Sequence, residues 1–215
     1  GLNTVISASE ETDAAQSVRD FEGYQAAGVL PLVGQWNTHT YSATTQARSQ
    51  ISALCKEQGI RLWMSEVGSG GSGIAGNLNL AQKLMDDIRY IMPVAWVDWQ
   101  YVEEGNDQWC LVQGDFTKQT YHKVKNYSIR QHFSKFIRPG YTFLTSLNGQ
   151  TLAARNPEGD SLIIVAINQN ALPVVHRADL SFYESISSEL TALRSSETED
   201  LSPTADYTFK DRILT

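Results

Sequence analysis

The stretch Leu62-Trp63-Met64-Ser65-Glu66-Val67-Gly68 decides the fold, and it opens directly into a glycine-rich segment, Gly70-Gly71-Ser72-Gly73. A short apolar run of this kind predicts a strand buried on both faces, as in a parallel sheet. Barrel proteins with parallel strands carry their chemistry at the carboxyl ends of those strands. Glu66 stands at such an end and is therefore the first candidate catalytic residue. The alternative is that Glu66 caps a loop or pairs with a surface cation.

Strand and helix patterns alternate on both sides of this stretch. The predicted strands are 4–8, 30–36, 60–66 and 94–99, and the predicted helices are 14–27, 43–58 and one marked by the apolar residues from 78 to 88. Counted from Val5, Pro31, Ile60 and Val94, the strands start 26, 29 and 34 residues apart. This is about what one strand, one helix and two loops consume in a (β/α)8 barrel. A doubly wound sheet is the main competitor, but Ser7-Ala8-Ser9-Glu10 is not a glycine fingerprint.

The predicted secondary structure changes at Pro139-Gly140 from mixed strands and helices to short strands. Before it, a polar loop follows residue 99 and a helix is predicted over 121–136. After it, short β-branched runs are separated by Asn148-Gly149 and by Pro157-Glu158-Gly159, which are hairpin signals. Further strands are predicted over 174–182, 186–194 and 207–214, with an acidic loop over 195–203. We therefore expect an α/β domain over 1–138 and a small antiparallel β-sandwich over 139–215.

Composition limits the class of partner. The 215 residues carry a net charge of -7, so nucleic acid and anionic membranes are disfavoured, and no run reaches transmembrane length. Cys55 and Cys110 lack metal or redox spacing, and no cofactor is expected. The first residues show no signal peptide. Because the chain begins without Met and enters a strand at once, we expect it to be part of a longer protein.

Each predicted strand delivers polar or aromatic residues at its carboxyl end, which indicates one shared site. These residues are Glu10, Glu11, Trp36, His39, Tyr41, Glu66, Trp96, Asp98, Trp99 and Gln100. A carboxylate with Tyr and His neighbours suits glycoside hydrolysis, where a retaining enzyme holds two carboxylates about 5 Å apart. Of the two carboxylates that such a pair requires, only Glu66 is a convincing candidate here.

Several of the remaining residues have more than one interpretation. Glu10 and Glu11 are candidates for the second carboxylate, although their adjacency equally suggests a solvated turn. His39 suits a substrate hydrogen bond better than a metal, because the other histidines are scattered, and no metal site is predicted. Asp98 fits a hydrogen-bonding role at the sheet edge as well as it fits a contact with substrate.

Four stretches, in order between residues 36 and 140, resemble glycoside hydrolase family 30, which includes glucosylceramidases, β-1,6-glucanases, β-1,6-galactanases and glucuronoxylanases. Residues 36–41 look like the His-x-Tyr motif after strand six, residues 63–66 like the strand-seven nucleophile motif, and residues 95–100 like strand eight. The most specific match is 132–140, HFSKFIRPG, which is similar to the helix exit that leads into the side β-sandwich.

The resemblance implies a fold and a set of roles. The chain would hold strands five to eight of a (β/α)8 TIM barrel plus part of the side sandwich. Glu66 would be the nucleophile, supported by Tyr41. His39, Trp36, Trp96, Trp99, Gln100 and Glu10 would line the sugar site. The family's acid/base glutamate ends strand four in an Asn-Glu pair, and no such pair precedes Glu10.

The resemblance therefore predicts a retaining β-glycoside hydrolase that acts on a neutral β-linked glycan, a galactan or a glucan. The chain itself would be a fragment without the acid/base half and inactive alone. Its expected partners are an oligo- or polysaccharide and either the missing N-terminal half or a second copy, and the full-length protein would be secreted or periplasmic. The alternative functions are a non-catalytic carbohydrate-binding protein and an assembly module.

Overall fold

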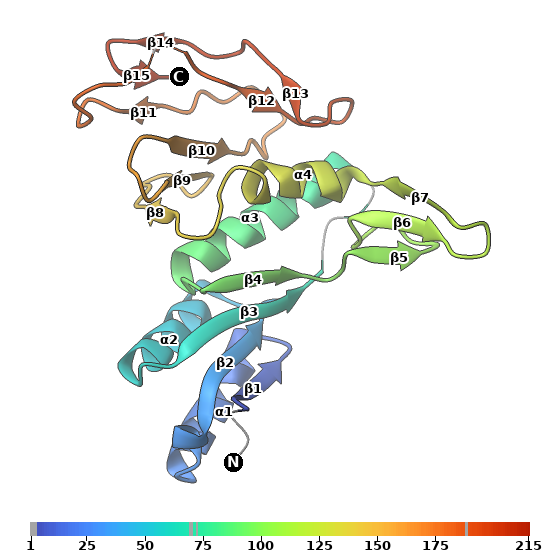
Figure 1. Cartoon of the computed structure of the whole chain (residues 1–215), viewed down its shortest axis with the longest axis vertical. Helices are drawn as coiled ribbons and strands as arrows, with labels where there is room; N and C mark the ends of the chain where they lie inside the picture. The colour runs from blue at the N-terminus through green and yellow to red at the C-terminus, as the bar shows by residue number, and fades with distance from the viewer. Residues whose placement is uncertain (1–3, 69–70, 72, 188) are drawn as a thin grey trace.

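The computed structural model describes residues 4–68, 71, 73–187 and 189–215. Its N-terminal part has an α/β fold, as the sequence predicts (Figure 1). The elements are β1 Ile6–Glu11, α1 Ala14–Ala26, the 3-10 turn η1 Leu30–Leu32, β2 Val33–His39, α2 Thr45–Glu57, β3 Arg61–Val67, α3 Ile74–Tyr90 and β4 Ala95–Asp98. The glycine-rich segment after β3 falls partly outside the described residues.

β1 to β4 form one parallel sheet in the order of the sequence. This is the order of neighbouring strands in a (β/α)8 barrel, whereas a doubly wound sheet reverses its order at a switch point. Because all four strands run the same way, their carboxyl ends meet at one edge of the sheet. That edge carries Glu10, His39, Glu66 and Asp98.

Local signals begin and end the first two helices. Asp13 caps α1 by accepting from the amides of Ala15 and Gln16 at 2.7 and 3.1 Å, and Thr44 caps α2 by accepting from the amide of Ala47 at 3.1 Å. Gly28 and Gly59 follow these helices with φ of +69° and +66°, a left-handed conformation that costs glycine nothing. No helix in the described ranges is long and apolar enough to cross a membrane.

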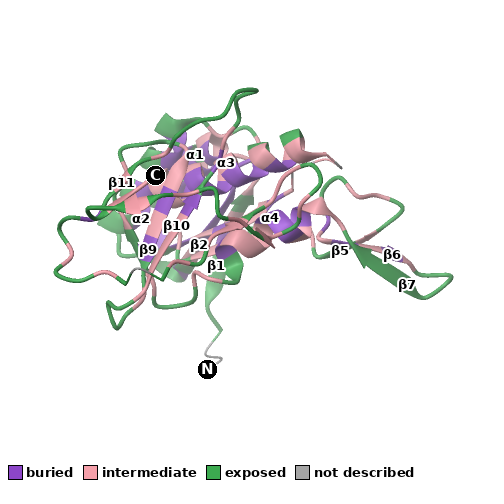
Figure 2. Ribbon diagram, turned by 90° about the horizontal axis from the view of Figure 1, so that it is seen from above, coloured by how far each residue is buried: buried purple, intermediate pink, exposed green. Residues whose placement is uncertain are grey.

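The main core lies where the helices meet the sheet, and Figure 2 shows the buried residues gathered there. Trp36 and Met64 are fully buried on the helix side of neighbouring strands. Side chains two positions apart on a strand share a face, so the residues between them point to the other side of the sheet. This alternation decides which predicted site residues are accessible.

A small sheet that the sequence did not predict follows β4. It consists of β5 Val102–Glu104, β6 Val112–Asp115 and β7 Thr120–Lys123, and it extends away from the rest of the molecule (Figure 1). The predicted helix over 121–136 is therefore wrong at its start. Residues 120–123 pair with β6, and α4 spans Lys125–Ser134.

The C-terminal part consists of short antiparallel pairings. β8 Thr142–Leu144, β9 Thr151–Arg155 and β10 Leu162–Ala166 form one sheet, and the remaining strands are two residues each: β11 Ala178–Asp179, β12 Leu193–Arg194, β13 Ser202–Pro203, β14 Phe209–Lys210 and β15 Ile213–Leu214. The long strands predicted over 174–182 and 186–194 are thus mostly irregular. The single strand predicted over 207–214 is a hairpin, and the acidic loop ends in β13.

The second core cluster joins the two parts of the chain. Ala81, Leu84 and Met85 of α3 pack with Ile129 and Phe133 of α4 and with Leu152, Val165 and Ile167 of the C-terminal sheet. The boundary predicted at residue 138 falls between α4 and β8, but apolar packing continues across it.

Candidate active site

Glu66 lies at the carboxyl end of β3 and is held by a tyrosine from the segment that follows the neighbouring strand β2. The hydroxyl of Tyr41 donates to Glu66 Oε1 at 2.9 Å, and the amide of Gly68 donates to the same hydroxyl at 3.2 Å. Burial and the neighbouring Glu66 carboxylate raise the pKa of Tyr41 to about 12. The hydroxyl therefore keeps its proton and remains a donor that fixes the orientation of Glu66, whose side chain is 28% exposed.

His39 lies between Glu66 and a second carboxylate, Glu10. His39 Nε2 is 3.0 Å from Glu10 Oε2, and His39 Nδ1 is 3.8 Å from Glu66 Oε1. Nδ1 is buried and has no hydrogen-bond partner among the described residues. The imidazole of His39 therefore lies between the carboxylates of Glu10 and Glu66 at the carboxyl edge of the sheet.

Glu10 is anchored by donors from two neighbouring strands. Ser65 Oγ donates to Glu10 Oε2 at 2.7 Å, and the Asn37 side-chain amide donates to Glu10 Oε1. Burial alone would raise the pKa of Glu10, but the hydrogen bonds from Ser65, Asn37 and His39 bring it below its ordinary value. A general acid in glycoside hydrolysis needs a raised pKa, so Glu10 suits a hydrogen-bonding role and not proton donation.

Glu11 takes no part in this group. Its carboxyl group faces Asp20 of α1, and a hydrogen bond between the two raises the pKa of Glu11. Of the two adjacent glutamates, Glu10 is thus the one that lies 3.0 Å from His39, and Glu11 as the second carboxylate stays a prediction.

Sequence reasoning missed Asn37 and Ser65, although both belong to the group around Glu10. Asn37 also donates to Ser7 Oγ at 2.7 Å and accepts from Gln35 Nε2 at 3.0 Å. The strand period of two carried the signal, because Gln35, Asn37 and His39 fall on one face of β2.

The same period excludes Trp36 from the predicted sugar site. Trp36 is fully buried, donates from Nε1 to Ser17 Oγ at 2.8 Å, and packs edge-on against Phe21 and Tyr24 of α1. Its neighbours on β2 face the site while Trp36 faces the helix. A sugar cannot reach it, so the predicted role is corrected to core packing.

Trp96 is also committed to the helix side, contrary to the prediction that it lines the sugar site. Its Nε1 donates to Asp87 of α3 at 2.9 Å, and the guanidinium of Arg130 from α4 lies 4.1 Å from its ring centre. Asp98, two residues on, accepts from Arg130 Nε at 2.7 Å and so faces the same way. Burial raises the pKa of Asp98, and Arg130 opposes that rise. Both residues join β4 to the helices.

Trp99 directly follows β4 and remains accessible, with 44% exposure. Its amide donates to Val67 O at 3.1 Å, and a Cβ added at Gly68 would lie 2.4 Å from Trp99 O and 3.2 Å from Trp99 Cδ1. Only glycine permits this close approach two residues after Glu66. Gln100 points instead into the small sheet, where its side chain donates to Glu103 Oε2 at 2.6 Å.

Helix α3 supports the Tyr41 segment from behind. Asp87 is fully buried and accepts from Thr40 Oγ1 at 2.8 Å, from Trp96, and from Arg48 Nε at 2.7 Å. Burial raises the pKa of Asp87, and the charge and hydrogen bonds of Arg48 oppose the rise. One turn earlier, Lys83 Nζ donates to Tyr41 O at 3.1 Å. The residue that orients Glu66 is thus tied to the helix layer.

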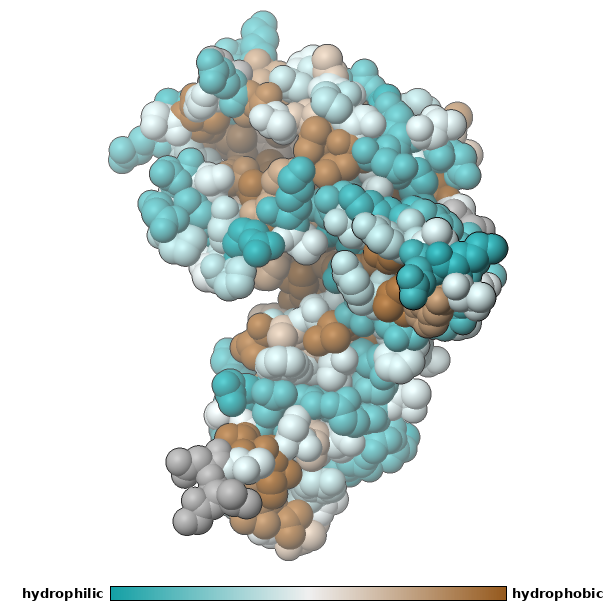
Figure 3. All heavy atoms as spheres, turned by 45° about the vertical axis from the view of Figure 1, so that its right-hand side comes forward, coloured by the Kyte–Doolittle hydropathy of each residue, from teal (hydrophilic) through white to brown (hydrophobic). Residues whose placement is uncertain are grey.

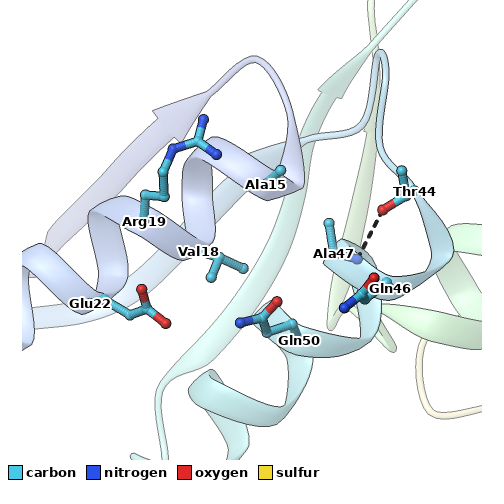
Figure 4. A pocket seen from close by; sticks show the side chains of 8 residues that line it. All are labelled: Ala15, Val18, Arg19, Glu22, Thr44, Gln46, Ala47 and Gln50. Atoms are coloured by element: carbon cyan, nitrogen blue, oxygen red, sulfur yellow. Dashed lines mark hydrogen bonds between the residues drawn. The ribbon is translucent and has the colours of Figure 1, made fainter.

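Outside the carboxyl edge of the sheet, the described residues show fewer features of an active site. No group of three or more His, Cys, Asp or Glu side chains in the described ranges could hold a metal ion. A groove between α1 and α2 is lined by Ala15, Val18, Arg19, Glu22, Thr44, Gln46, Ala47 and Gln50 (Figure 4). It contains none of the predicted site residues.

Two curated enzymes share sequence with this chain. An endo-beta-1,6-galactanase of Hypocrea rufa is 27% identical over 169 residues, which are 78% of this chain and 34% of that protein. An exo-beta-1,6-galactobiohydrolase of Bifidobacterium longum subsp. longum is 30% identical over 109 residues, covering 47% of this chain and 7% of that protein. The chain thus spans about a third, or less, of these relatives. No protein-family model matches it.

Solved structures share the fold over nearly the whole chain. A GH30 endoxylanase from Clostridium papyrosolvens C71 matches with a TM-score of 0.75 at 17% identity, covering 99% of this chain and 53% of that one. The catalytic domain of GH30 xylanase C from Talaromyces cellulolyticus matches with a TM-score of 0.75 at 19% identity, covering 99% and 49%. These matches show that the chain has the fold of about half of a GH30 catalytic domain. It also shares sequence with the galactanase over most of its own length.

Proposed function

We propose that this chain is the nucleophile-bearing part of a retaining β-glycoside hydrolase. The observation that carries the proposal is the 2.9 Å hydrogen bond from Tyr41 to Glu66 at the carboxyl edge of a parallel sheet. A carboxylate fixed at such an edge and partly exposed can approach a sugar held beside it. Barrel enzymes place catalytic groups at this position.

In the proposed reaction Glu66 attacks the anomeric carbon as a carboxylate. A glycosyl ester forms, the glycosidic C–O bond breaks, and the leaving oxygen takes a proton from an acid that lies outside this chain. Water then attacks the anomeric carbon, gives its proton to the conjugate base of that acid, and the bond from this carbon to Glu66 breaks, which frees Glu66 as a carboxylate. Tyr41 holds the attacking carboxylate in place, and His39, Glu10 and Trp99 contact the sugar. Gln100 acts only indirectly, because its side chain is turned into the small sheet.

The missing acid leads us to propose that the four strand–helix units are half of a (β/α)8 barrel, strands five to eight. Val5 and Ile6 of the β1 segment and Leu32 before β2 are exposed, and Figure 3 shows apolar residues on the surface beside the N-terminal end. An unpaired strand edge with exposed apolar side chains seeks a partner. We propose that an N-terminal half, or a second copy of the chain, covers it. The C-terminal sheets from residue 139 would be part of the side β-sandwich.

For the substrate we propose a neutral β-linked glycan, a galactan before a glucan. The names of the two curated relatives, a β-1,6-galactanase and a β-1,6-galactobiohydrolase, support galactan. Residues 100–115 next to Trp99 contain four carboxylates and no Lys or Arg, which disfavours an acidic sugar. A polysaccharide substrate also supports a secreted or periplasmic location for the full-length protein.

The test replaces Glu66 in a protein whose barrel is completed by its upstream half. Glu66→Gln should lower turnover of an aryl β-galactoside by about 10³-fold or more, whereas Glu57→Gln, at the exposed end of α2, should not change it. Glu66→Gly with azide should regain turnover and release the α-glycosyl azide, because azide attacks from the face that Glu66 vacates. Undiminished turnover in Glu66→Gln would refute the proposal.

A non-catalytic carbohydrate-binding function is the second candidate, because Glu10 has a lowered pKa and Glu11 faces Asp20, so neither suits the acid. That function predicts saturable oligosaccharide binding by calorimetry without hydrolysis, even after the upstream half is attached. Hydrolysis by the completed barrel would exclude it.

A further inference from the structure

The small sheet β5–β7 brings a second exposed tryptophan to the segment that follows Glu66. Trp109 lies between β5 and β6 and is 39% exposed. A Cβ added at Gly68 would lie 3.3 Å from Trp109 Cβ and 3.2 Å from Trp99 Cδ1. Trp99 and Trp109 therefore both border Gly68.

Backbone hydrogen bonds fix this arrangement. The amide of Gly71 donates to Gln108 O at 2.6 Å, and the amide of Gln100 donates to Trp109 O at 2.7 Å. The loop after the nucleophile strand, the end of β4 and the loop that carries Trp109 are thus joined. The position of Trp109 is set by the backbone and not by the conformation of an isolated loop.

A carboxylate also fixes the indole ring. Trp109 Nε1 donates to Glu103 Oε2 at 3.1 Å, and the same oxygen accepts from Gln100 at 2.6 Å. With its N–H group satisfied at the ring edge, the indole keeps an apolar face for contact. An aromatic face that is held in place and partly exposed suits stacking against the apolar C–H face of a sugar, because little side-chain freedom is lost on binding.

We propose that Trp109 forms the wall of a second sugar subsite, adjacent to the one at Glu66, and that this subsite takes a neutral pyranose unit of an oligosaccharide. The inference rests on the proposed function. Two residues of extended chain separate Glu66 from Gly68, which is about 7 Å and comparable to the width of one pyranose ring. The carboxylates of residues 100–115 favour an uncharged unit over a uronic acid there.

The opposite face of the same sheet supplies a matched control. Tyr121 pairs with Gly114 across β6 and β7, and Gly114 pairs with Glu104. Because neighbouring residues on a strand alternate, Tyr121 lies on the face away from Glu103. It is 78% exposed, so its loss removes an accessible aromatic ring that is not directed at the site.

The experiment measures binding by calorimetry to the barrel completed by its upstream half, with Glu66→Gln present in every variant so that the sugars are not hydrolysed. Methyl β-galactoside and β-1,6-galactotriose are the probes. Trp109→Ala should weaken binding of the trisaccharide by about 5- to 10-fold and leave the monosaccharide unchanged. Trp109→Phe should retain most of the affinity, and Tyr121→Ala should behave as wild type. Far-UV circular dichroism verifies that each variant is folded.

The outcomes separate this inference from the proposed function. Trisaccharide binding that is unchanged in Trp109→Ala would overturn the subsite and leave the proposed function standing. Equal loss for both sugars would overturn the assignment of Trp109 to a neighbouring subsite. A completed barrel with Trp109 intact that binds neither sugar would overturn the subsite and the sugar site at Glu66 together.

Discussion

Removal of the Asp87 carboxylate should destabilise the chain far more than any change to its neighbour on α3. Asp87 is fully buried and accepts three hydrogen bonds, from Arg48, Thr40 and Trp96. Asp87→Ala would leave a buried guanidinium without its counter-charge, because the Arg48 side chain is only 8% exposed. Breaking a buried pair in this way costs about 3–5 kcal/mol.

The loss can be measured as the free energy of unfolding in urea, followed by far-UV circular dichroism. With a slope of about 2 kcal/mol per M, a cost of 4 kcal/mol lowers the midpoint by roughly 2 M. Asp86→Ala is the matched control, since Asp86 is 29% exposed and lies 3.9 Å from Arg89, and it should cost less than about 1 kcal/mol.

A double variant separates charge from shape. Arg48→Met with Asp87→Leu removes both charges and fills the space with apolar atoms, so it should recover most of the stability that Asp87→Ala loses. Equal midpoints for Asp87→Ala and Asp86→Ala would refute the reasoning. They would mean that the network around Asp87 does not support the Tyr41 segment.

Two further predictions concern the site itself. Gly68→Ala should cost about 1–3 kcal/mol in urea unfolding and shift the tryptophan fluorescence, because its Cβ would lie 2.4 Å from Trp99 O. Gly23→Ala, inside α1 and with no atom within 4 Å of the added Cβ, should not lower the stability, because alanine favours a helix over glycine. Equal losses for the two variants would contradict the close packing at Gly68. The pKa of Glu10 is lower in the folded chain than its ordinary value of 4.5, so its carboxylate stabilises the fold above that pH, and this contribution is lost as the pH falls through the folded pKa. Glu10→Gln should therefore flatten the fall in stability below about pH 4.5, and a curve parallel to that of the wild type would show that these hydrogen bonds do not favour the ionised form.

The sequence alone was sufficient for the strand–helix order of the first 100 residues. A period of two in the apolar residues indicates a strand, and a period of 3.6 indicates a helix. Both periods can be read within a single element, because each element must bury one of its own faces. Asp13, Thr44, Gly28 and Gly59 mark helix ends for equally local reasons. The position of Glu66 after an apolar run also predicted the edge at which it would stand.

The tertiary structure alone decided which side chains share that edge. Trp36, Trp96 and Trp99 are similar in sequence context, yet only Trp99 faces outward, because the helix layer covers one side of each strand and the strand period fixes the rest. Glu10 and Glu11 are adjacent, and their different partners set their different pKa directions. Ser65, Asn37 and His39 lower the pKa of Glu10, whereas Asp20 raises that of Glu11. The sheet β5–β7 brings Trp109 to Gly68. Its strands are three or four residues long and show no clear periodicity, so they are stabilised by pairing with one another and cannot be recognised from the local sequence.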